Sequence, residues 1–565
     1  MNNEEIARIF FEIADILEMQ DVKWKPEAYR RAARLIQSLP EELSELRRKQ
    51  KLEELPGIGE AIAKKINELL DTGKLEYYER LKKDFPVDVY ALTSVPSLGP
   101  KKLKVLYEKL GVKSIEDLKK AALEHRISGL PGFKERSEEK ILEGIALFES
   151  AQKRKPLPHA LREADKLASY LKSTGYASIV ELAGSIRRRK ETVGDIDILA
   201  VSENPEKIME AFVSFPEVMN IIGKGQTKSS VLLKSGMNAD LRVVEQGSFG
   251  SALMYFTGSK EHNIELRKLA HSKGFKLNEY GVFRGDEKIG GNTEEEVYNL
   301  LGIEYIPPEI RENKGEISLA IERKLPKLVE QGDIQGDLHM HTVMSDGSDD
   351  VRMLAEKGQK MGYEYIGITE HIKKKKTPNA LGEEDAKAYV EKIRSTETRV
   401  KLLCGAEVDI GSDGMPEISK SVLSLFDFVI GAVHYGFEME SNKLNERIER
   451  AINNDDIHII AHPSGRKFGV REKMPLDFGR IFSLASEKGK ILEINSCPDR
   501  LDLNDALARE ALQHGALLTI CSDAHSAVEM ENIVFGVYMA RRAWAEKRHI
   551  LNSLPYQELK KRLGF

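Results

Sequence analysis

The chain has 565 residues and a formal net charge of −5 at pH 7. Its length allows several domains, each with its own core, and its slight negative charge excludes a chain-wide attraction to nucleic acid. Three widely spaced cysteines, without a CxxC pair, argue against a disulfide framework or a thiolate zinc site, and no apolar run is long enough to span a membrane. We therefore expect a cytoplasmic protein with no membrane partner.

Helices joined by glycine-rich turns are predicted for residues 1–150. Apolar residues at helical spacing predict helices over residues 4–19 and 27–36. A turn at residues 55–66 contains Gly57 and Gly59, residues 95–102 repeat the pattern with Gly99, and residues 130–134 form a looser third copy. One such turn is usually a plain connection between helices. Three in one region resemble helix-hairpin-helix units, whose backbone N–H groups contact DNA phosphates without reading sequence.

A predicted strand after residue 194 carries two carboxylates on one face. Asp195 and Asp197 are two residues apart, so on a strand both side chains point to the same side. A third carboxylate, Asp240, lies on the strand-like run of residues 239–244. An isolated acidic pair is more often part of a turn, but three carboxylates on neighbouring strands suit a two-metal site for phosphoryl transfer.

The residues just before this strand offer groups that bind phosphate. Gly184 and Ser185 supply backbone N–H groups and a hydroxyl, and Arg188 supplies a guanidinium group. Together with the three carboxylates they predict metal-assisted nucleotidyl transfer.

These motifs resemble the palm of the family X DNA polymerases. The likeness continues through a sugar-sensing turn at residues 255–259, a thumb-like segment at residues 274–281 and a segment at residues 298–309 that resembles the family's closing signature. The resemblance implies that Asp195, Asp197 and Asp240 hold two Mg²⁺ ions. Val193 replaces a hydroxyl residue of vertebrate relatives, which puts one phosphate contact in doubt. The residues that the resemblance assigns to the nucleotide are Gly184, Ser185, Arg188, Gly194, Tyr255, Phe256, Gly258 and Asn263.

Residues 1–80 resemble the small lyase-type domain of the same family. Lys65 falls at the position of the family's Schiff-base lysine, whose amine can attack a sugar aldehyde. Ala61 stands where vertebrate relatives have a lysine, so a purely DNA-binding role for Lys65 is the alternative. The residues expected to contact DNA are Lys25, Gly57, Gly59, Gly99 and Lys101.

The second half of the chain alternates short apolar runs with helical segments, which predicts a parallel α/β barrel. The strand-like runs are residues 365–369, 400–406, 428–433, 457–461, 491–494 and 517–521. Chemistry in such barrels gathers at the carboxyl ends of the strands. Six of the chain's 13 histidines and three carboxylates fall there: His339, His341, Asp346, His371, Glu407, His434, His462, Asp523 and His525. One such histidine would be unremarkable, but nine residues of this kind predict metal ligands.

These nine positions resemble the ligand set of the PHP (polymerase and histidinol phosphatase) superfamily. The resemblance implies a distorted (β/α)7 barrel that holds up to three Mn²⁺ or Zn²⁺ ions bridged by Glu407. Glu370 is a departure, because that motif usually has aspartate before His371. Both halves together resemble the bacterial and archaeal family X polymerases with a C-terminal PHP domain.

We therefore expect a multidomain α+β and α/β protein. The predicted domains are a lyase-like helix-hairpin-helix domain (1–80), a fingers-like helix-hairpin-helix domain (81–152), a nucleotidyltransferase palm (153–250), a thumb (251–312), a linker (313–332) and a PHP domain (333–565).

The leading hypothesis for function is a monomeric DNA-directed DNA polymerase that uses dNTPs to fill short gaps in gapped or nicked DNA during base excision repair. The resemblance implies 3′–5′ exonuclease action in the PHP domain and leaves AP endonuclease and 3′-phosphatase action open. One alternative makes the first half a DNA-binding platform for the nuclease, but a platform would not need three converging carboxylates. Another makes the PHP domain a small-molecule phosphatase, which the predicted DNA-binding turns argue against.

Overall fold

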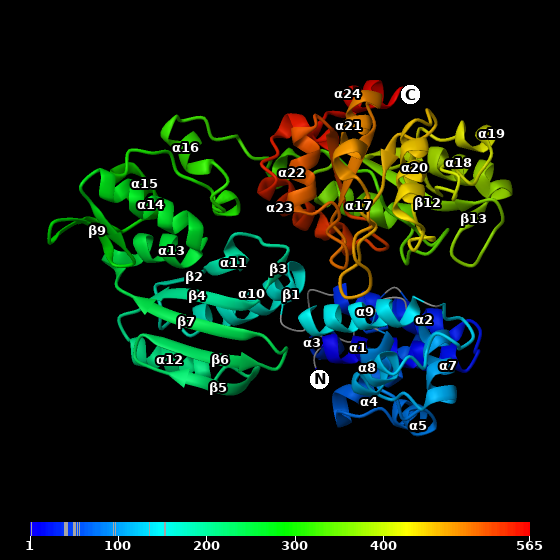
Figure 1. Cartoon of the computed structure of the whole chain (residues 1–565), viewed down its shortest axis with the longest axis horizontal. Helices are drawn as coiled ribbons and strands as arrows, with labels where there is room; N and C mark the ends of the chain where they lie inside the picture. Colours follow the sequence, from blue (N-terminus) through cyan, green and yellow to red (C-terminus); the bar gives the residue numbers. More distant parts are fainter. Residues whose placement is uncertain are drawn as a thin grey trace.

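The computed structural model describes the chain except residues 2, 39–42, 49–51, 54, 56, 94, 96–97, 135 and 152–153. Parts of the first two predicted glycine turns (residues 56 and 96–97) and the predicted start of the palm (residue 153) lie outside the described residues. In Figure 1 the amino-terminal part, drawn in blue and cyan, is helical. Its helices are α1 (Asn3–Met19), α2 (Lys25–Ser38), α3 (Leu43–Arg48), α4 (Glu60–Thr72), α5 (Glu76–Asp84), α6 (Val89–Thr93), α7 (Pro100–Leu110), α8 (Ile115–Leu123) and α9 (Ser137–Ala151).

One hydrophobic core joins these helices. It extends from Ile6 to Ile145, and α1 packs against α6 and α7 as well as against α2 and α5. The segments predicted as two helix-hairpin-helix domains therefore share one core, because the apolar face of α1 is covered from both segments.

The palm is a five-stranded sheet in the order β2-β4-β7-β6-β5. Neighbouring strands β4 and β7 are parallel, and the other pairs are antiparallel. Helices α10 and α12 pack against the sheet. The palm elements are β1 (Lys155–Pro156), α10 (Leu157–Ser173), β2 (Ile179–Leu182), α11 (Gly184–Arg187), β3 (Thr192–Val193), β4 (Asp195–Val201), α12 (Pro205–Val213), β5 (Val218–Lys224), β6 (Lys228–Leu233) and β7 (Asn238–Val244).

The thumb follows with helices and a small antiparallel sheet: α13 (Phe249–Thr257), α14 (Lys260–Ser272), β8 (Lys276–Asn278), β9 (Gly281–Arg284), β10 (Glu287–Gly290) and α15 (Glu294–Leu300). Its core also includes Ala320 and Leu328. The segment predicted as a linker at residues 313–332 therefore packs onto the thumb, and it contains helix α16 (Glu316–Ile321). The segment has too few apolar residues among its charged ones for the sequence to predict this packing.

The carboxyl-terminal part is a nearly closed barrel of parallel strands in the order β11-β12-β14-β15-β16-β17-β18. A parallel bridge between Met340 and Ala524 brings its two ends together. The strands are β11 (Gly336–Asp337), β12 (Tyr365–Lys373), β13 (Leu381–Gly382, paired with β12), β14 (Lys401–Asp409), β15 (Phe428–Ala432), β16 (Ile459–Ile460), β17 (Ile491–Asn495) and β18 (Leu517–Cys521). The helices are α17 (Val351–Lys360), α18 (Ala386–Ser395), α19 (Lys420–Leu423), α20 (Ser441–Ile452), α21 (Phe478–Lys488), α22 (Asp505–Gln513), α23 (Ile533–Arg542) and α24 (Tyr556–Leu563).

The barrel confirms the fold class predicted for the second half. Each predicted strand run overlaps one strand of the barrel, because its apolar residues are buried on both faces of a parallel sheet. All three cysteines are free. Among the described residues, no helix combines the length and the apolar character that crossing a membrane requires.

Candidate active sites

The palm carboxylates lie on the two parallel strands at the centre of the sheet. Asp197 of β4 is the register partner of Asp240 of β7, and Asp195 is the partner of Asn238. The Asp195 residue is exposed, and Asp197 and Asp240 are half-buried. Lys228 on β6 forms an ion pair with Asp240, with 2.8 Å between Nζ and Oδ2.

Mutual repulsion is visible at Asp197. Burial, followed by the charges of Asp195 and Asp240, raises the pKa of Asp197 to about 6. Among the described residues, the barrel alone contains groups of three or more metal-binding side chains whose ligand atoms lie within 4.8 Å of one another. The palm carboxylates are therefore farther apart than the members of those groups. Like charges stay apart unless cations lie between them, and carboxylate oxygens are the ligands that Mg²⁺ prefers.

The turn before β4 lies directly against these carboxylates. Gly184 has φ +59°, and a Cβ atom there would lie 2.0 Å from Asp197 Oδ2. The backbone N–H of Ala183 donates to the carbonyl of Asp197 at 2.8 Å, which fixes the turn to the strand. Ser185, the next residue of the turn, is half-buried. A Cβ atom at Gly194 would lie 3.2 Å from the guanidinium group of Arg154.

Arg188 is held by the thumb. Its Nε donates to Glu312 Oε1 at 3.1 Å, and its Nη1 donates to the carbonyl of Thr257. A Cβ at Gly258 would lie 3.0 Å from Arg188 Nη1, and Gly258 has φ +72°, so two constraints favour glycine there. The guanidinium group therefore lies against the predicted sugar-sensing turn.

The other predicted nucleotide contacts come from α13 and α14. Tyr255 and Phe256 are half-buried and meet edge to face, with ring centroids 5.1 Å apart. Arg242 lies over the Phe256 ring at 4.5 Å from its centroid. Asn263 Nδ2 donates to the carbonyl of Tyr255 at 2.7 Å, which ties α14 to the turn. The structure thus brings the turn at residues 255–259 next to the predicted phosphate-binding residue Arg188.

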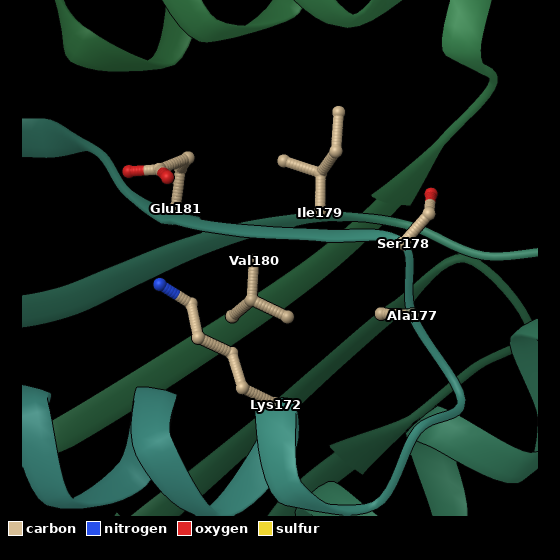
Figure 2. A pocket seen from close by; sticks show the side chains of 6 residues that line it. All are labelled: Lys172, Ala177, Ser178, Ile179, Val180 and Glu181. Carbon is tan, nitrogen blue, oxygen red and sulfur yellow. The ribbon is translucent and has the colours of Figure 1, made fainter.

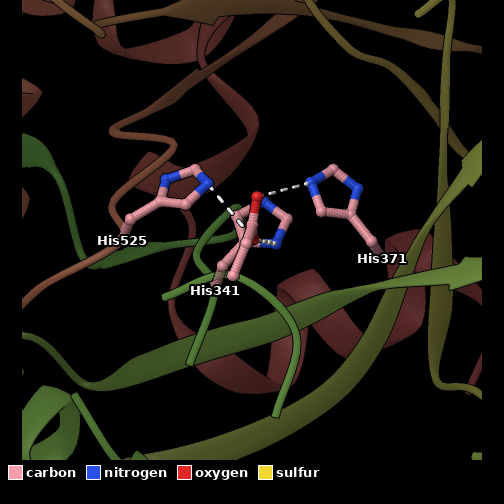
Figure 3. A group of neighbouring side chains, drawn as sticks. His341, His371 and His525 are labelled. Carbon is pink, nitrogen blue, oxygen red and sulfur yellow. Dashed lines mark ion pairs between the residues drawn. The ribbon is translucent and has the colours of Figure 1, made fainter. Parts of the chain in front are cut away.

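The barrel gathers the predicted histidines and carboxylates at the carboxyl ends of its strands. Three groups of side chains have ligand atoms within 4.8 Å of one another: His341 with Asp346, His371 and His525; His339 with His341 and Asp523; and His371 with Glu407 and His434. Figure 3 shows His371 and His525 on either side of His341, with ring nitrogens turned toward the space between them. His371 Nε2 and His525 Nε2 lie 3.6 Å and 3.4 Å from the carboxylate of Asp346.

Glu407 is the centre of this constellation. Its Oε2 lies 3.0 Å from His371 Nδ1, 3.4 Å from His339 Nε2 and 3.5 Å from His341 Nε2. Its Oε1 lies 3.3 Å from Nε2 of both His434 and His462. The imidazoles of His371, His339 and His434 hold the pKa of Glu407 well below its usual range, although burial opposes them.

Unsatisfied ring nitrogens indicate that the site fits metal ions. Both ring nitrogens of His341, Nε2 of His339 and Nδ1 of His462 are buried and have no hydrogen-bond partner in the described part of the chain. Burial lowers the pKa of His341 to about 4, so its imidazole is neutral and carries a free lone pair. Buried polar atoms are normally paired, and a divalent ion is the partner that suits neutral imidazole and carboxylate together.

A second set of carboxylates, which was not predicted from the sequence, orients the histidines. With its Nδ1 protonated, His339 donates to Glu493 Oε1 at 2.7 Å, and His434 likewise donates to Asp409 Oδ1 at 2.6 Å. Each contact leaves Nε2 directed at Glu407, and this is the usual way in which a protein fixes a metal-binding tautomer. Glu493 lies within the predicted strand run 491–494, where an acidic residue in an apolar run was the available signal. Asp409 lies beyond the predicted run 400–406, at the end of the longer observed strand β14.

Glu370, the departure from the PHP pattern, supports a neighbouring loop. It is fully buried and accepts a hydrogen bond from the backbone N–H of Thr342 at 3.1 Å and another from the hydroxyl of Ser345. Burial raises its pKa to about 7. These contacts hold the loop that carries Asp346.

The predicted DNA contacts in the amino-terminal helices stand at helix starts. Gly59 and Gly99 are the N-cap residues of α4 and α7, and Gly57 has φ +84° in the turn before α4. Lys25 is the first residue of α2, and Lys101 is exposed in the first turn of α7. Free N–H groups at a helix start, next to lysine, suit a phosphate.

Lys65 lies on α4 and is half-buried. Its Nζ donates to the carbonyl of Ala61 at 3.3 Å and lies 5.3 Å from the ring centroid of Tyr77. The neighbouring Lys64 is paired with Glu60 at 2.6 Å. The amine of Lys65 thus contacts an aromatic ring and a backbone carbonyl.

Two surface hollows lie apart from these sites. One is on α14, lined by Ile264, Arg267, Lys268 and His271. The other, shown in Figure 2, is at the outer edge of the palm, where Val180 points toward Lys172 while Ile179 and Glu181 point the other way. Ile179 pairs with Val201, at the end of β4 opposite to the carboxylates. Neither hollow is lined by a predicted metal ligand.

The segments of this chain that match known protein families follow the same order as the parts described above. Residues 1–75 match a family described as helix-hairpin-helix domain, 89–146 a SAM-like helix-hairpin-helix tandem, 252–312 the DNA polymerase beta thumb, and 337–496 the PHP domain. The DNA polymerase/3′-5′ exonuclease PolX of Bacillus subtilis (strain 168) is 35% identical over 561 residues, which cover 98% of both chains. DNA polymerase lambda of Arabidopsis thaliana is 26% identical over 349 residues, or 55% of this chain and 62% of that protein.

Proposed function

This chain belongs to the PolX family of DNA polymerase/3′–5′ exonucleases, and we propose on that premise that it extends DNA at the palm and shortens DNA 3′ ends in the barrel. It is a DNA-directed DNA polymerase of family X. The observation that carries the assignment of the two activities is that the chain has two separate groups of acidic or imidazole side chains. One lies across β4 and β7, and the other lies at the mouth of the barrel.

In the proposed palm reaction, Asp195, Asp197 and Asp240 hold two Mg²⁺ ions. When bound, the ions would neutralise the charge of the triphosphate and lower the pKa of the attacking 3′-hydroxyl. Ser185, Arg188 and the backbone at Gly184 and Gly194 would hold the phosphates of the dNTP, which the closeness of Gly184 to Asp197 supports. The residues proposed to pack around the sugar are Tyr255, Phe256, Gly258 and Asn263.

In the proposed barrel reaction, the nine predicted ligands hold up to three Mn²⁺ or Zn²⁺ ions. When bound, these ions would polarise a phosphodiester and activate water. Glu493 and Asp409 would keep His339 and His434 in the ligating tautomer. Arg500, whose Nε lies 3.8 Å from Asp523 Oδ2, would supply positive charge to the phosphate.

We further propose that the substrate is gapped or nicked DNA and that the activity serves repair. The glycine turns before α4 and α7 would hold the DNA backbone, with Lys25 and Lys101 beside them. Such contacts position DNA without selecting a sequence, which suits repair at any site.

The experiment that tests the two assignments compares Asp240→Ala with His339→Ala/His341→Ala in the full chain. Both variants are checked by melting curve, by binding of a gapped duplex, by gap filling with Mg²⁺ and by shortening of a 3′ end with Mn²⁺. Bound metal is measured by mass spectrometry as a readout that does not depend on activity.

Asp240→Ala is expected to lose nucleotide addition and to keep DNA binding and 3′-end shortening. The histidine variant is expected to lose metal from the barrel and 3′-end shortening and to keep gap filling. Extension by Asp240→Ala at the wild-type rate would refute the palm site. Wild-type shortening by the histidine variant would refute the barrel site, and loss of both activities from one folded variant would refute their separation.

A further inference from the structure

The loop that follows α11 is enclosed between thumb and barrel. In Figure 1 helices α22 and α23 lie on the side of the barrel nearest α11 and α16. The guanidinium of Arg189 lies 4.5 Å from the ring centroid of Tyr538 on α23. Glu191 Oε2 accepts a hydrogen bond from Arg466 Nη1 of the barrel at 2.7 Å. The loop that carries a proposed phosphate-binding residue is therefore a contact surface for the barrel.

Arg542, the last residue of α23, makes the central contact. Its side chain is 2% exposed. Its Nη1 donates to the backbone carbonyls of Arg188 at 2.7 Å and of Glu309 at 3.1 Å. On the barrel side its Nε and Nη2 lie 2.8 Å and 2.6 Å from Asp505 Oδ2. The rigid guanidinium fork thus joins α22 of the barrel to the loop of the palm.

Arg542 also shares a carboxylate with Arg188. Glu312 Oε1 lies 3.1 Å from both Arg188 Nε and Arg542 Nη1, and Lys190 Nζ is 3.9 Å away. Burial works against the charge of Glu312, but Arg188, Arg542 and Lys190 together lower its pKa. A buried carboxylate is costly once it loses its partner. While Arg542 stays, Arg188 can leave Glu312 for a phosphate without leaving that charge unpaired.

We propose that Arg542 of the barrel is a positioning residue for the palm, which holds the backbone at Arg188 and neutralises Glu312 so that Arg188 can bind the phosphates of an incoming nucleotide. The proposal rests on the nucleotide-binding role given to Arg188 under the proposed function. It makes the barrel a structural part of the polymerase site, in addition to its own chemistry.

The test uses Arg542→Met in the full chain, with steady-state kinetics for a dNTP on a gapped duplex. We expect the KM for the dNTP to rise about tenfold, the scale of one lost hydrogen bond to a charged group, and kcat to change much less. Because Asp505 loses its partner in this variant, Arg542→Met/Asp505→Asn is measured alongside it. Arg548→Met is the matched control, since that side chain is 72% exposed and, among the described residues, forms an ion pair with Glu546 alone.

Comparison with Arg188→Ala separates this proposal from the proposed function. If Arg542 acts through Arg188, Arg188→Ala/Arg542→Met should have the same KM as Arg188→Ala. Wild-type KM in both Arg542 variants would overturn the proposal, as would additive effects in the double variant. Proportional loss of gap filling and 3′-end shortening would assign Arg542 to barrel folding and also overturn it. An unchanged KM in Arg188→Ala would instead refute the nucleotide role of Arg188 itself.

Discussion

Glu493 offers a sharp test of the barrel metal centre, because it contacts ligands without being a predicted ligand. It is fully buried. One of its oxygens accepts from His339 Nδ1 at 2.7 Å. The other accepts from the backbone N–H of His462 at 2.6 Å and from Asn495 Nδ2 at 3.1 Å. Glu493→Gln keeps the shape of the side chain but leaves only one of these two acceptor positions.

Either orientation of the new amide damages the site. If its oxygen keeps the His462 N–H, its NH₂ group faces His339 and forces that ring into the tautomer with Nε2 protonated, which cannot bind a metal. If its oxygen keeps His339, the N–H of His462 loses its acceptor. Loss of such an orienting contact typically weakens metal affinity or activity about 10- to 100-fold, or about 1.4 to 2.7 kcal/mol. That range agrees with the roughly 1.5 to 3 kcal/mol of a hydrogen bond to a charged group.

The assay is a Mn²⁺ titration of 3′-end shortening, with bound metal measured after dialysis. The midpoint should move to a Mn²⁺ concentration about 10- to 100-fold higher, with gap filling unchanged. Glu487→Gln, on the exposed face of α21, is the matched control. A wild-type midpoint and wild-type metal content in Glu493→Gln would refute the reasoning that this carboxylate fixes the tautomer of His339.

Two further predictions concern the first half of the chain. Gly184→Ala places a methyl group 2.0 Å from Asp197 Oδ2, on a backbone with φ +59°. We expect at least a tenfold loss of gap filling, with 3′-end shortening retained. Gap filling at the wild-type rate would contradict the contact between turn and strand. Lys65→Ala is expected to weaken binding of gapped DNA in a titration, because this lysine lies on α4, the helix that follows the glycine turn proposed to hold the DNA backbone. Borohydride trapping on a 5′-deoxyribose-phosphate end that is lost in this variant would instead establish a Schiff base.

Local pattern was sufficient for the fold class and for the types of residue at each site. The alternation around Asp195 and Asp197 predicted a strand with both carboxylates on one face, and β4 begins at Asp195. Histidines placed after apolar runs predicted a barrel mouth rich in metal-binding groups, and six of them contribute to the constellation around Glu407 and Asp346. In both inferences each residue was placed by its position in, or directly after, a single strand, which is the range over which strand geometry acts.

The sequence did not reveal the packing between segments. The charged segment at residues 313–332 looked like a linker, yet Ala320 and Leu328 complete the thumb core. One core also spans residues 1–80 and 81–152, because α1 contacts helices of both segments. Composition does not show which distant residues pack against the few apolar residues of a polar segment.

The residues that orient the sites were decided by tertiary structure alone. Glu493 approaches His339 from 154 residues away in the chain, and Arg542 reaches the carbonyl of Arg188 from 354 residues away. Neither contact leaves a periodic signal, because a hydrogen bond between distant elements depends on how those elements pack. Sequence reasoning therefore identified groups capable of binding metal and phosphate, whereas only the folded chain showed which neighbours fix their tautomers, charges and positions.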